Sequence, residues 1–290
     1  MNHKKSAFLF PLHEPKFVFG SDLIASINKY LAGYPVFVVF SNTAEADTFG
    51  VLYPNLLYTP IAFPYGVDSG IINKKKFYGI QQIIETTGCE YIACIDSEAC
   101  IIKSDNVDQR FEHYYNRKTL FATNTIQSDF IDQVIKSSYR FFDQAEAEQL
   151  HTILNASRLY YWFNEIPVYR RDVFIRFAQH IQLKQKFETL TWFDFDYLLY
   201  GYYCLLHEGF KIEVITDTHL PISFMESQGQ ISKELFSKGV NKIQPGWIKQ
   251  PAPFYQNAFM TFHNDRDDRK FSPALFLKKV LSKVKRIFTR

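Results

Sequence analysis

The chain has 290 residues, of which 47% are hydrophobic and 22% are charged, and this composition excludes an intrinsically disordered protein. The net charge is +3, but residues 269–290 hold eight Lys and Arg residues and no acidic residue. Subtracting these eight leaves −5 for residues 1–268, so the charge gives no support for a nucleic-acid partner and we expect none.

Alternating short apolar runs and helical patterns fill the first 125 residues. The apolar runs predict strands over residues 7–12, 35–40, 55–59, 90–95 and 120–123. Helical spacing predicts one helix over residues 21–31, with Ser21 as its N-cap, and another over residues 73–86. Strands and helices joined by short links predict an α/β fold with a mostly parallel sheet flanked by helices.

The second half of the chain has mainly helical patterns. These predict helices within residues 129–180, a strongly apolar helix over residues 191–208 and a strand over residues 211–215. Residues 272–290 predict a basic amphipathic helix, which is typical of a segment that lies on an anionic membrane surface. Docking of this helix on the body or on a partner is the alternative that stays open.

The sequence also predicts the cellular location. The four cysteines lack metal-site spacing, and a reducing compartment suits them. The first apolar stretch is too short for a signal peptide, and no stretch reaches the roughly 18 apolar residues of a membrane span. We therefore expect a cytoplasmic protein, attached peripherally to the inner face of the cytoplasmic membrane if the basic helix binds lipid.

Two carboxylates stand directly after the predicted strand 90–95, in Asp96-Ser97-Glu98. In parallel sheets, ligands bind beyond the carboxyl ends of the strands. Two converging carboxylates suit Mg²⁺ or Mn²⁺, which such sites hold together with phosphate oxygens. The alternative is a solvated acidic turn.

The lysine-bearing helix at residues 73–84, the strand that follows it and Asp96-Ser97-Glu98 together resemble the nucleotide-sugar-binding half of GT-A glycosyltransferases. The chain is similar in particular to bacterial glycosyltransferases of capsule and lipopolysaccharide clusters, which carry an Asp-Ser-Asp-like motif and a later Tyr-x-x-Tyr-Gly helix. That helix corresponds here to residues 195–203, and the resemblance extends over about residues 6–215. Glu98 departs from the pattern, because it stands in place of an Asp and is one methylene longer.

The resemblance implies a single GT-A-like, Rossmann-type catalytic domain over residues 1–268, followed by the basic helix at 269–290. Residues 6–125 would form the nucleotide-sugar half, and residues 126–268 would form a helical acceptor half. The implied activity is transfer of a sugar from a nucleoside-diphosphate sugar, most simply a UDP-sugar, to a glycan or lipid-linked acceptor in surface polysaccharide synthesis. The implied cofactor is Mn²⁺ or Mg²⁺.

The site residues that we carry over fall into four groups. The nucleotide-sugar would be bound by Pro11, His13, Asn42, Lys74, Lys75, Asp96 and Ser97. The metal would be held by Asp96, Glu98 and His263. The catalytic base would be Asp196, which we prefer, or Asp194. The acceptor would be bound by Trp162, Glu165 and Arg170.

Several alternatives stay open for these residues. Asp194 and Asp196 also suit simple capping of the helix that follows them, and residues 160–167 also suit a packed aromatic corner. Three successive lysines on a helix point in different directions, so at most two of Lys74, Lys75 and Lys76 should reach one ligand. The residues do not decide between an inverting and a retaining enzyme.

The sequence also bears on other possible functions. The chain has no G-x-G-x-x-G, which argues against a Rossmann oxidoreductase. A sugar nucleotidyltransferase is a weaker alternative, because no glycine-rich loop follows the first predicted strand. A non-catalytic, decayed transferase that acts as a glycan-binding or scaffold protein stays open, since Glu98 departs from the motif.

Overall fold

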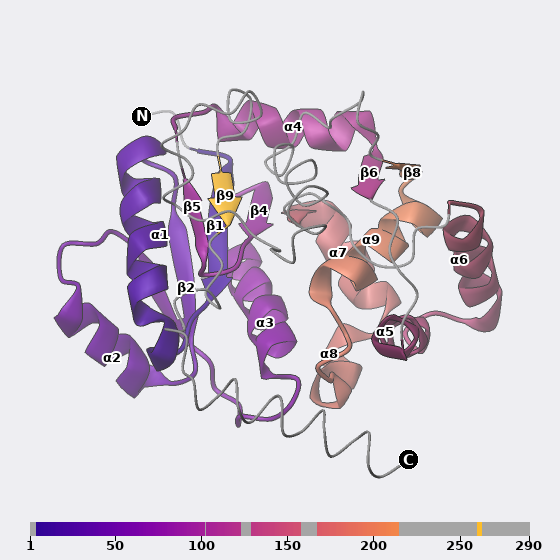
Figure 1. Cartoon of the computed structure of the whole chain (residues 1–290), viewed down its shortest axis with the longest axis horizontal. Helices are drawn as coiled ribbons and strands as arrows, with labels where there is room; N and C mark the ends of the chain where they lie inside the picture. Colours follow the sequence, from indigo (N-terminus) through magenta and orange to yellow (C-terminus); the bar gives the residue numbers. More distant parts are fainter. Residues whose placement is uncertain (1–3, 102, 123–128, 158–166, 215–259, 263–290) are drawn as a thin grey trace, which may run out of the picture.

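The computed structural model describes residues 4–101, 103–122, 129–157, 167–214 and 260–262. A five-stranded sheet in the order β3-β2-β1-β4-β7 forms the centre of the first half (Figure 1). Its strands are β1 (Ser6–Pro11), β2 (Val36–Phe40), β3 (Thr59–Ala62), β4 (Tyr91–Cys94) and β7 (Val168–Arg170). Strands β1 to β4 run parallel, and only β7 runs antiparallel to its neighbour β4. The predicted α/β fold with a mostly parallel, helix-flanked sheet is confirmed and is consistent with a GT-A-like Rossmann fold.

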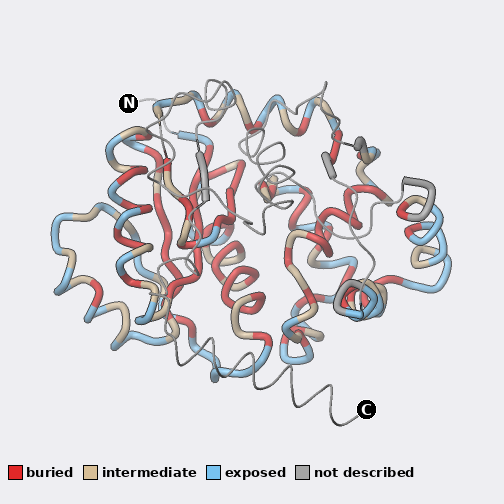
Figure 2. Tube along the Cα trace, viewed as in Figure 1, coloured by how far each residue is buried: buried red, intermediate tan, exposed pale blue. Residues whose placement is uncertain are grey.

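Helices cover both faces of this sheet. Leu9 faces α3 (Ile71–Thr86), where Gly79 leaves room for it, while Phe8 on the opposite face contacts Phe111 of α4 (Val107–Arg117). Helix α1 (Phe17–Tyr30) packs on the same face as α4, through the contact of Phe17 with Phe40. Strands β1, β2 and β4 are buried along their whole length, as expected for parallel strands covered on both faces (Figure 2).

The second half is mainly helical and lies beside the β7 edge of the sheet (Figure 1). Its helices are α5 (Asp129–Tyr139), α6 (Gln144–Ser157), α7 (Arg171–His180), α8 (Leu183–Lys186) and α9 (Asp196–His207). Two short strand pairs complete the described structure. β5 (Ala99–Ile101) pairs with β9 (Met260–Phe262), and β6 (Thr119–Ala122) pairs with β8 (Lys211–Val214).

Several predicted boundaries were wrong. Helix α1 begins at Phe17, so Ser21 is not its N-cap, and the Ser21 hydroxyl donates to the Val18 carbonyl at 2.8 Å instead. The strand predicted at residues 55–59 lies four residues later, at Thr59–Ala62. The helix predicted from residue 191 begins at Asp196, because residues 191–194 form a turn.

Helix α2 (Thr43–Leu52) was not predicted, and its composition explains why. Phe49 is its only fully buried residue, so the apolar spacing of a helix is missing. Its start is set instead by Asn42, whose side-chain oxygen accepts the Glu45 N–H at 2.9 Å, while the Glu45 carboxylate accepts the Ser41 N–H at 2.9 Å. This arrangement is close to a capping box.

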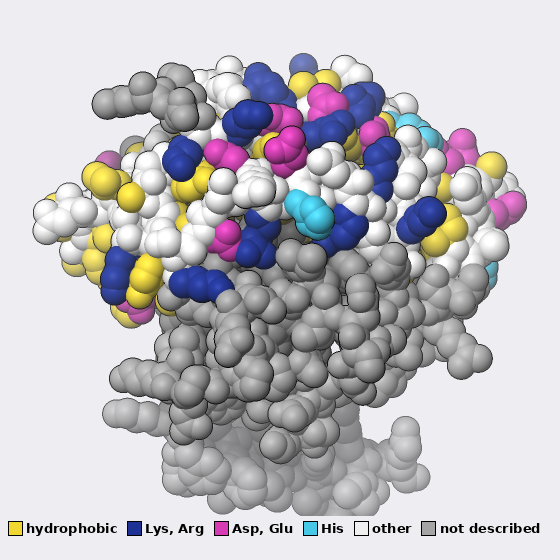
Figure 3. Space-filling model, turned by 90° about the horizontal axis from the view of Figure 1, so that it is seen from above, with side chains coloured by type: hydrophobic (Ala, Val, Ile, Leu, Met, Phe, Trp, Pro, Cys, Tyr) yellow, Lys and Arg dark blue, Asp and Glu magenta, His cyan; other side chains and the backbone are white. Residues whose placement is uncertain are grey.

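The four cysteines are free thiols, and Cys94 and Cys204 are buried as predicted. Within the part of the chain that the structure describes, no helix is long and apolar enough to cross a membrane. The predicted basic helix at 272–290 lies outside the described residues. Figure 3, which views the molecule from above, shows basic and acidic side chains interspersed on the described part of that face.

Candidate functional site

The strand order has a switch point between β1 and β4. From β1 the chain adds β2 and β3 on one side, and it then crosses over to add β4 on the other side. Such a switch point leaves the carboxyl ends of the two central strands without a connection above them, and ligands of α/β sheets bind there. His13 and Lys16 follow β1, and Asp96-Ser97-Glu98 follows β4.

The two carboxylates after β4 each hold a lysine. Asp96 forms an ion pair with Lys76, with 3.3 Å between its Oδ1 and the ammonium Nζ. The Glu98 Oε1 accepts from Lys16 Nζ at 3.1 Å, and its Oε2 accepts from the Ser97 hydroxyl at 3.1 Å. The Asp96 side chain is 51% exposed, whereas that of Glu98 is 14% exposed. Asp96 is therefore the carboxylate that presents itself to a ligand from solvent.

Helix α3 supplies three consecutive lysines, and all three are buried. Lysines at the start of a helix are ordinarily solvated, but here each ammonium is held by other groups of the protein. Lys74 Nζ binds Asp68 at 2.5 Å and Glu188 at 3.2 Å, away from Asp96. Lys75 Nζ donates to the Leu12 carbonyl at 2.8 Å and to the Ser41 hydroxyl at 2.9 Å. Since Leu12 follows β1 and Ser41 follows β2, Lys75 lies at the carboxyl edge of the sheet.

Lys76 connects the exposed Asp96 to a buried carboxylate. Its Nζ lies 3.3 Å from Oδ1 of Asp196, the wholly buried first residue of α9. The other oxygen of Asp196 accepts a hydrogen bond from the buried Tyr169 hydroxyl of β7. Asp96, Lys76, Asp196 and Tyr169 thus form a continuous polar chain from the surface to the core.

Burial and charge set the protonation of this chain. Burial opposes the charge on Lys76, but the Asp196 and Asp96 carboxylates raise its pKa well above the usual range. Burial and then the Asp196 carboxylate raise the pKa of the Tyr169 hydroxyl well above its ordinary value. Lys76 therefore carries a fixed positive charge, and Tyr169 remains a hydrogen-bond donor.

The groups beside Lys75 differ in their charge. Burial lowers the pKa of Lys75 to about 8, although Glu45 acts in the opposite direction. Burial and then the Lys75 ammonium lower the pKa of His13, so its imidazole is neutral at neutral pH. The edge of the sheet therefore combines one lysine of fixed charge with one that titrates just above neutral pH.

The remaining predicted residues of the nucleotide-sugar group are placed as follows. Pro11 is the buried last residue of β1, and Asn42 is exposed and caps α2. Lys74 is not brought together with the others, because Asp68 and Glu188 hold its ammonium.

Asp194 and Asp196, the two predicted catalytic carboxylates, have different surroundings. Asp194 accepts from the Ser137 hydroxyl at 2.6 Å, from Arg140 at 2.5 Å and from the Thr191 N–H at 2.7 Å. These contacts join α5 to the turn before α9, whereas the N-cap of α9 is Phe195, so they are not those of a residue that caps α9. Both carboxylates are wholly buried with partners inside the protein, so a role as base stays a prediction.

Arg170 does not lie near the candidate site. The antiparallel register pairs Arg170 with Tyr91, the first residue of β4, whereas Asp96 follows the other end of that strand. Tyr91 and Asp96 are five positions apart, which in an extended chain corresponds to about 16 Å. Arg170 instead binds Asp172, at 2.6 Å from Nε to Oδ1. The other predicted acceptor residues, Trp162 and Glu165, and the predicted metal ligand His263 lie outside the described residues.

Sequence reasoning missed Lys16 and Tyr169 as members of the site, and among the three lysines of α3 it chose Lys74 and Lys75 over Lys76. For Lys76 a pattern was available, because it precedes Ile80 by one helical turn and so shares its buried face. Lys16 and Tyr169 reach the site only through tertiary packing, and neither stands in a motif.

Comparisons with known proteins give a likeness in structure alone. No family model matches the chain, and no curated protein matches it in sequence. Among solved structures, the chain is similar to the crystal structure of S. aureus TarS 1–349, with a TM-score of 0.38 and 12% sequence identity. The match covers 73% of this chain and 58% of that chain. A likeness of this size supplies no evidence about substrate or reaction.

Proposed function

We propose that the chain is a glycosyltransferase that moves a sugar from a nucleoside-diphosphate sugar, with UDP as the simplest carrier, to a glycan or lipid-linked acceptor in surface polysaccharide synthesis. The observation that supports this most strongly is the position of Asp96-Ser97-Glu98. The motif follows β4 at the switch point of the sheet, and Lys16, Lys75 and Lys76 lie against the same edge. Carboxylates beside lysines suit a ligand that has phosphate groups and a bound cation.

The lysines of this edge would act as phosphate ligands. Lys16 is 21% exposed, so a diphosphate could compete with Glu98 for its ammonium. Lys75 is more deeply placed, and an approaching phosphate would favour its charged form, because opposite charges stabilise each other at short range. Both lysines would then neutralise part of the charge of the leaving nucleoside diphosphate.

The residues present fit a hard divalent cation. Carboxylate oxygens are the ligands that Mg²⁺ and Mn²⁺ prefer, and Asp96 presents such an oxygen at the exposed end of the site. Glu98 would join it only after it releases Lys16, which would free the ammonium for phosphate. When bound, such a cation stabilises negative charge on the leaving diphosphate.

Asp196 and Tyr169 would act by position. The Tyr169 hydroxyl and Lys76 Nζ hold the two oxygens of Asp196, and Lys76 in turn lies 3.3 Å from Asp96. Lys76 thus links the half-exposed Asp96 carboxylate to the buried Asp196. A catalytic role for Asp194 or Asp196 as base would require either carboxylate to leave its present partners.

The test is a thermal-shift screen of nucleoside-diphosphate sugars with and without Mn²⁺, followed by measurement of nucleotide release with the donor that binds. A donor at 100 times its Kd should add about 2.7 kcal/mol, which corresponds to about 5–10 °C for a chain of this size. The Asp96→Asn variant should lose most of this shift and of the turnover. The Asp47→Asn variant, which changes an exposed carboxylate of α2, is the matched control and should retain both.

Normal turnover by a folded Asp96→Asn protein would refute the proposal. Donor binding without any metal-dependent release of nucleotide or free sugar would favour the alternative, a glycan-binding or scaffold protein derived from a transferase. Glu98, the residue that departs from the family motif, is the observation on which that alternative depends.

A further inference from the structure

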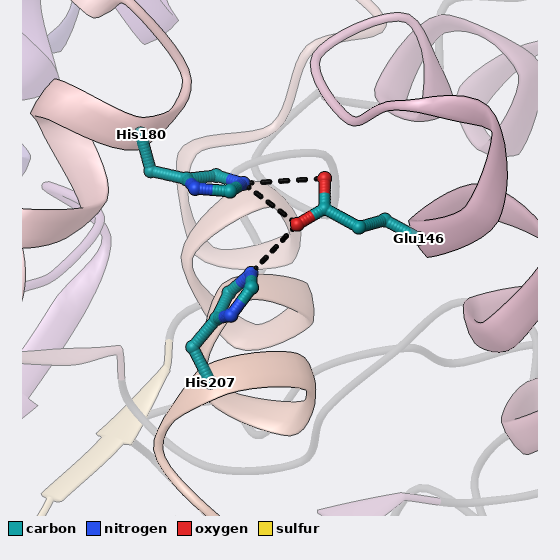
Figure 4. A group of neighbouring side chains, drawn as sticks. All are labelled: Glu146, His180 and His207. Atoms are coloured by element: carbon teal, nitrogen blue, oxygen red, sulfur yellow. Dashed lines mark hydrogen bonds and ion pairs between the residues drawn. The ribbon is translucent and has the colours of Figure 1, made fainter.

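Three side chains from three helices meet on the surface of the helical half (Figure 4). They are Glu146 of α6, His180 of α7 and His207 of α9. Glu146 Oε1 lies 3.0 Å from His180 Nε2 and 2.9 Å from His207 Nε2. One ligand atom from each of the three residues lies within 4.8 Å of the other two.

The carboxylate of this cluster is held in place by the start of its own helix. Glu146 Oε2 accepts the Asp143 N–H at 3.0 Å, and the Asp143 carboxylate accepts the Glu146 N–H at 2.9 Å. This reciprocal pair is a capping box at the N-terminus of α6. Oε1 contacts both imidazoles, and Oε2 also lies 3.2 Å from His180 Nε2, as Figure 4 shows.

The two imidazoles are also fixed in position. Their ring centroids are 4.5 Å apart, and both rings contact Tyr203, at 5.4 Å from His180 and 4.8 Å from His207. His180 is the last residue of α7 and His207 is the last residue of α9. Two helix C-termini therefore point their negative dipole ends toward the cluster, and this favours a cation there.

We propose that Glu146, His180 and His207 form a binding site for a divalent transition metal of the Zn²⁺ class. Two imidazole nitrogens and one carboxylate oxygen are a donor set that such a metal takes, with a fourth position open to water. Bond lengths of about 2.0–2.1 Å in a tetrahedron place neighbouring ligand atoms about 3.3 Å apart. The two Glu–His distances of 2.9 and 3.0 Å need to widen by only a few tenths of an ångström, and the ligand atoms of the two histidines lie within 4.8 Å of each other.

The site would brace the helical half. Glu146 belongs to α6, His180 ends α7 and His207 ends α9, so one ion would join three helices. Helix α9 begins at Asp196 and ends at His207. The twelve residues of this helix separate the two ends by about 17 Å. The metal would thus be structural and distinct from the cation proposed at Asp96.

The test uses the metal-free full chain, titrated with ZnCl₂ by calorimetry and melted with and without Zn²⁺. All proteins carry Asp96→Asn, which removes a carboxylate of the other candidate metal site. The parent should bind one Zn²⁺ and melt at a higher temperature with it. His207→Ala should abolish both effects, and Glu146→Gln, which retains an acceptor for the Asp143 N–H, should weaken binding at least 10-fold.

The matched control is His113→Ala, which removes an exposed histidine of α4 far from the cluster and should bind Zn²⁺ as the parent does. Equal melting temperatures of parent and Glu146→Gln in EDTA would show that the variant is folded. If the parent does not bind Zn²⁺, or if His207→Ala and Glu146→Gln bind it as well as the parent does, the cluster is only a Glu–His contact and the proposal fails.

Discussion

The buried pair of Asp196 and Lys76 gives the sharpest test of the site's electrostatics. The substitution Asp196→Asn keeps the shape of the side chain and an acceptor for the Tyr169 hydroxyl, but it removes the negative charge 3.3 Å from Lys76. The Lys76 side chain is 9% exposed, so its ammonium cannot recover a full shell of water. Leaving a buried charge without its partner typically costs about 3–5 kcal/mol.

The structure places the cost at the lower end of this range. Lys76 keeps Asp96 at 3.3 Å, and that carboxylate is 51% exposed and screened by solvent. We therefore expect Asp196→Asn to lower the free energy of unfolding by about 3 kcal/mol, which corresponds to a fall in Tm of about 6–12 °C. The substitution Asp96→Asn removes the other ion pair of Lys76, whose carboxylate is half exposed, and should lower the free energy of unfolding by about 0.5–1 kcal/mol.

Urea unfolding at pH 7 and 25 °C measures these differences, and Lys76→Met supplies the control. In the Asp196→Asn background, Lys76→Met removes the stranded charge and should recover most of the lost stability, because an apolar chain of similar length replaces it. If Asp196→Asn destabilises no more than Asp96→Asn, or if Lys76→Met does not rescue it, the assignment of Asp196 as the main partner of Lys76 is refuted.

Two further predictions concern α3. The pKa of Lys75 is about 8 in the folded chain, below the ordinary lysine value of 10.5 that it takes in the unfolded chain. Between pH 8 and pH 10.5 the unfolded chain therefore binds more protons than the folded chain, and the contribution of Lys75 to stability rises with pH. Urea unfolding of wild type and Lys75→Met should show a difference that shifts in favour of wild type from pH 7.5 to pH 10, and a constant difference would contradict this. Gly79→Ala should lower the free energy of unfolding by about 1–2 kcal/mol, because its Cβ would lie 2.7 Å from Val39 and 2.8 Å from Leu9. Gly88→Ala, whose Cβ meets nothing within 4 Å, should leave urea unfolding nearly unchanged, and equal losses for the two variants would refute the packing explanation.

The central strands could be predicted because they are buried on both faces. Such strands are continuous apolar runs, and the predictions over residues 7–12 and 90–95 match Ser6–Pro11 and Tyr91–Cys94 to within one residue. The edge strand Thr59–Ala62 is largely exposed and contains Pro60, so no apolar run marks it. The strand Val168–Arg170 has three residues and depends on its pairing with β4.

The candidate site could be predicted only where it follows a strand. Asp96 was found because it is the first polar residue after a buried strand, and the rule on carboxyl ends of strands applies to it directly. Lys76, which anchors Asp96, is itself held by Asp196. Lys76 and Asp196 are separated by 120 residues and meet only when α9 packs against α3. The same holds for Glu146, His180 and His207, whose spacing in sequence matches no metal motif.

The contacts of Glu98 depend on the length of its side chain. The extra methylene carries its carboxylate to Lys16 at the start of α1, while Ser97 occupies its second oxygen. A shorter Asp at this position would have to leave one of these partners. Asp96, by contrast, is held on one side by Lys76 and remains half exposed on the other. The two carboxylates are therefore not equivalent: Asp96 could receive the proposed cation directly, whereas Glu98 would first have to release Lys16.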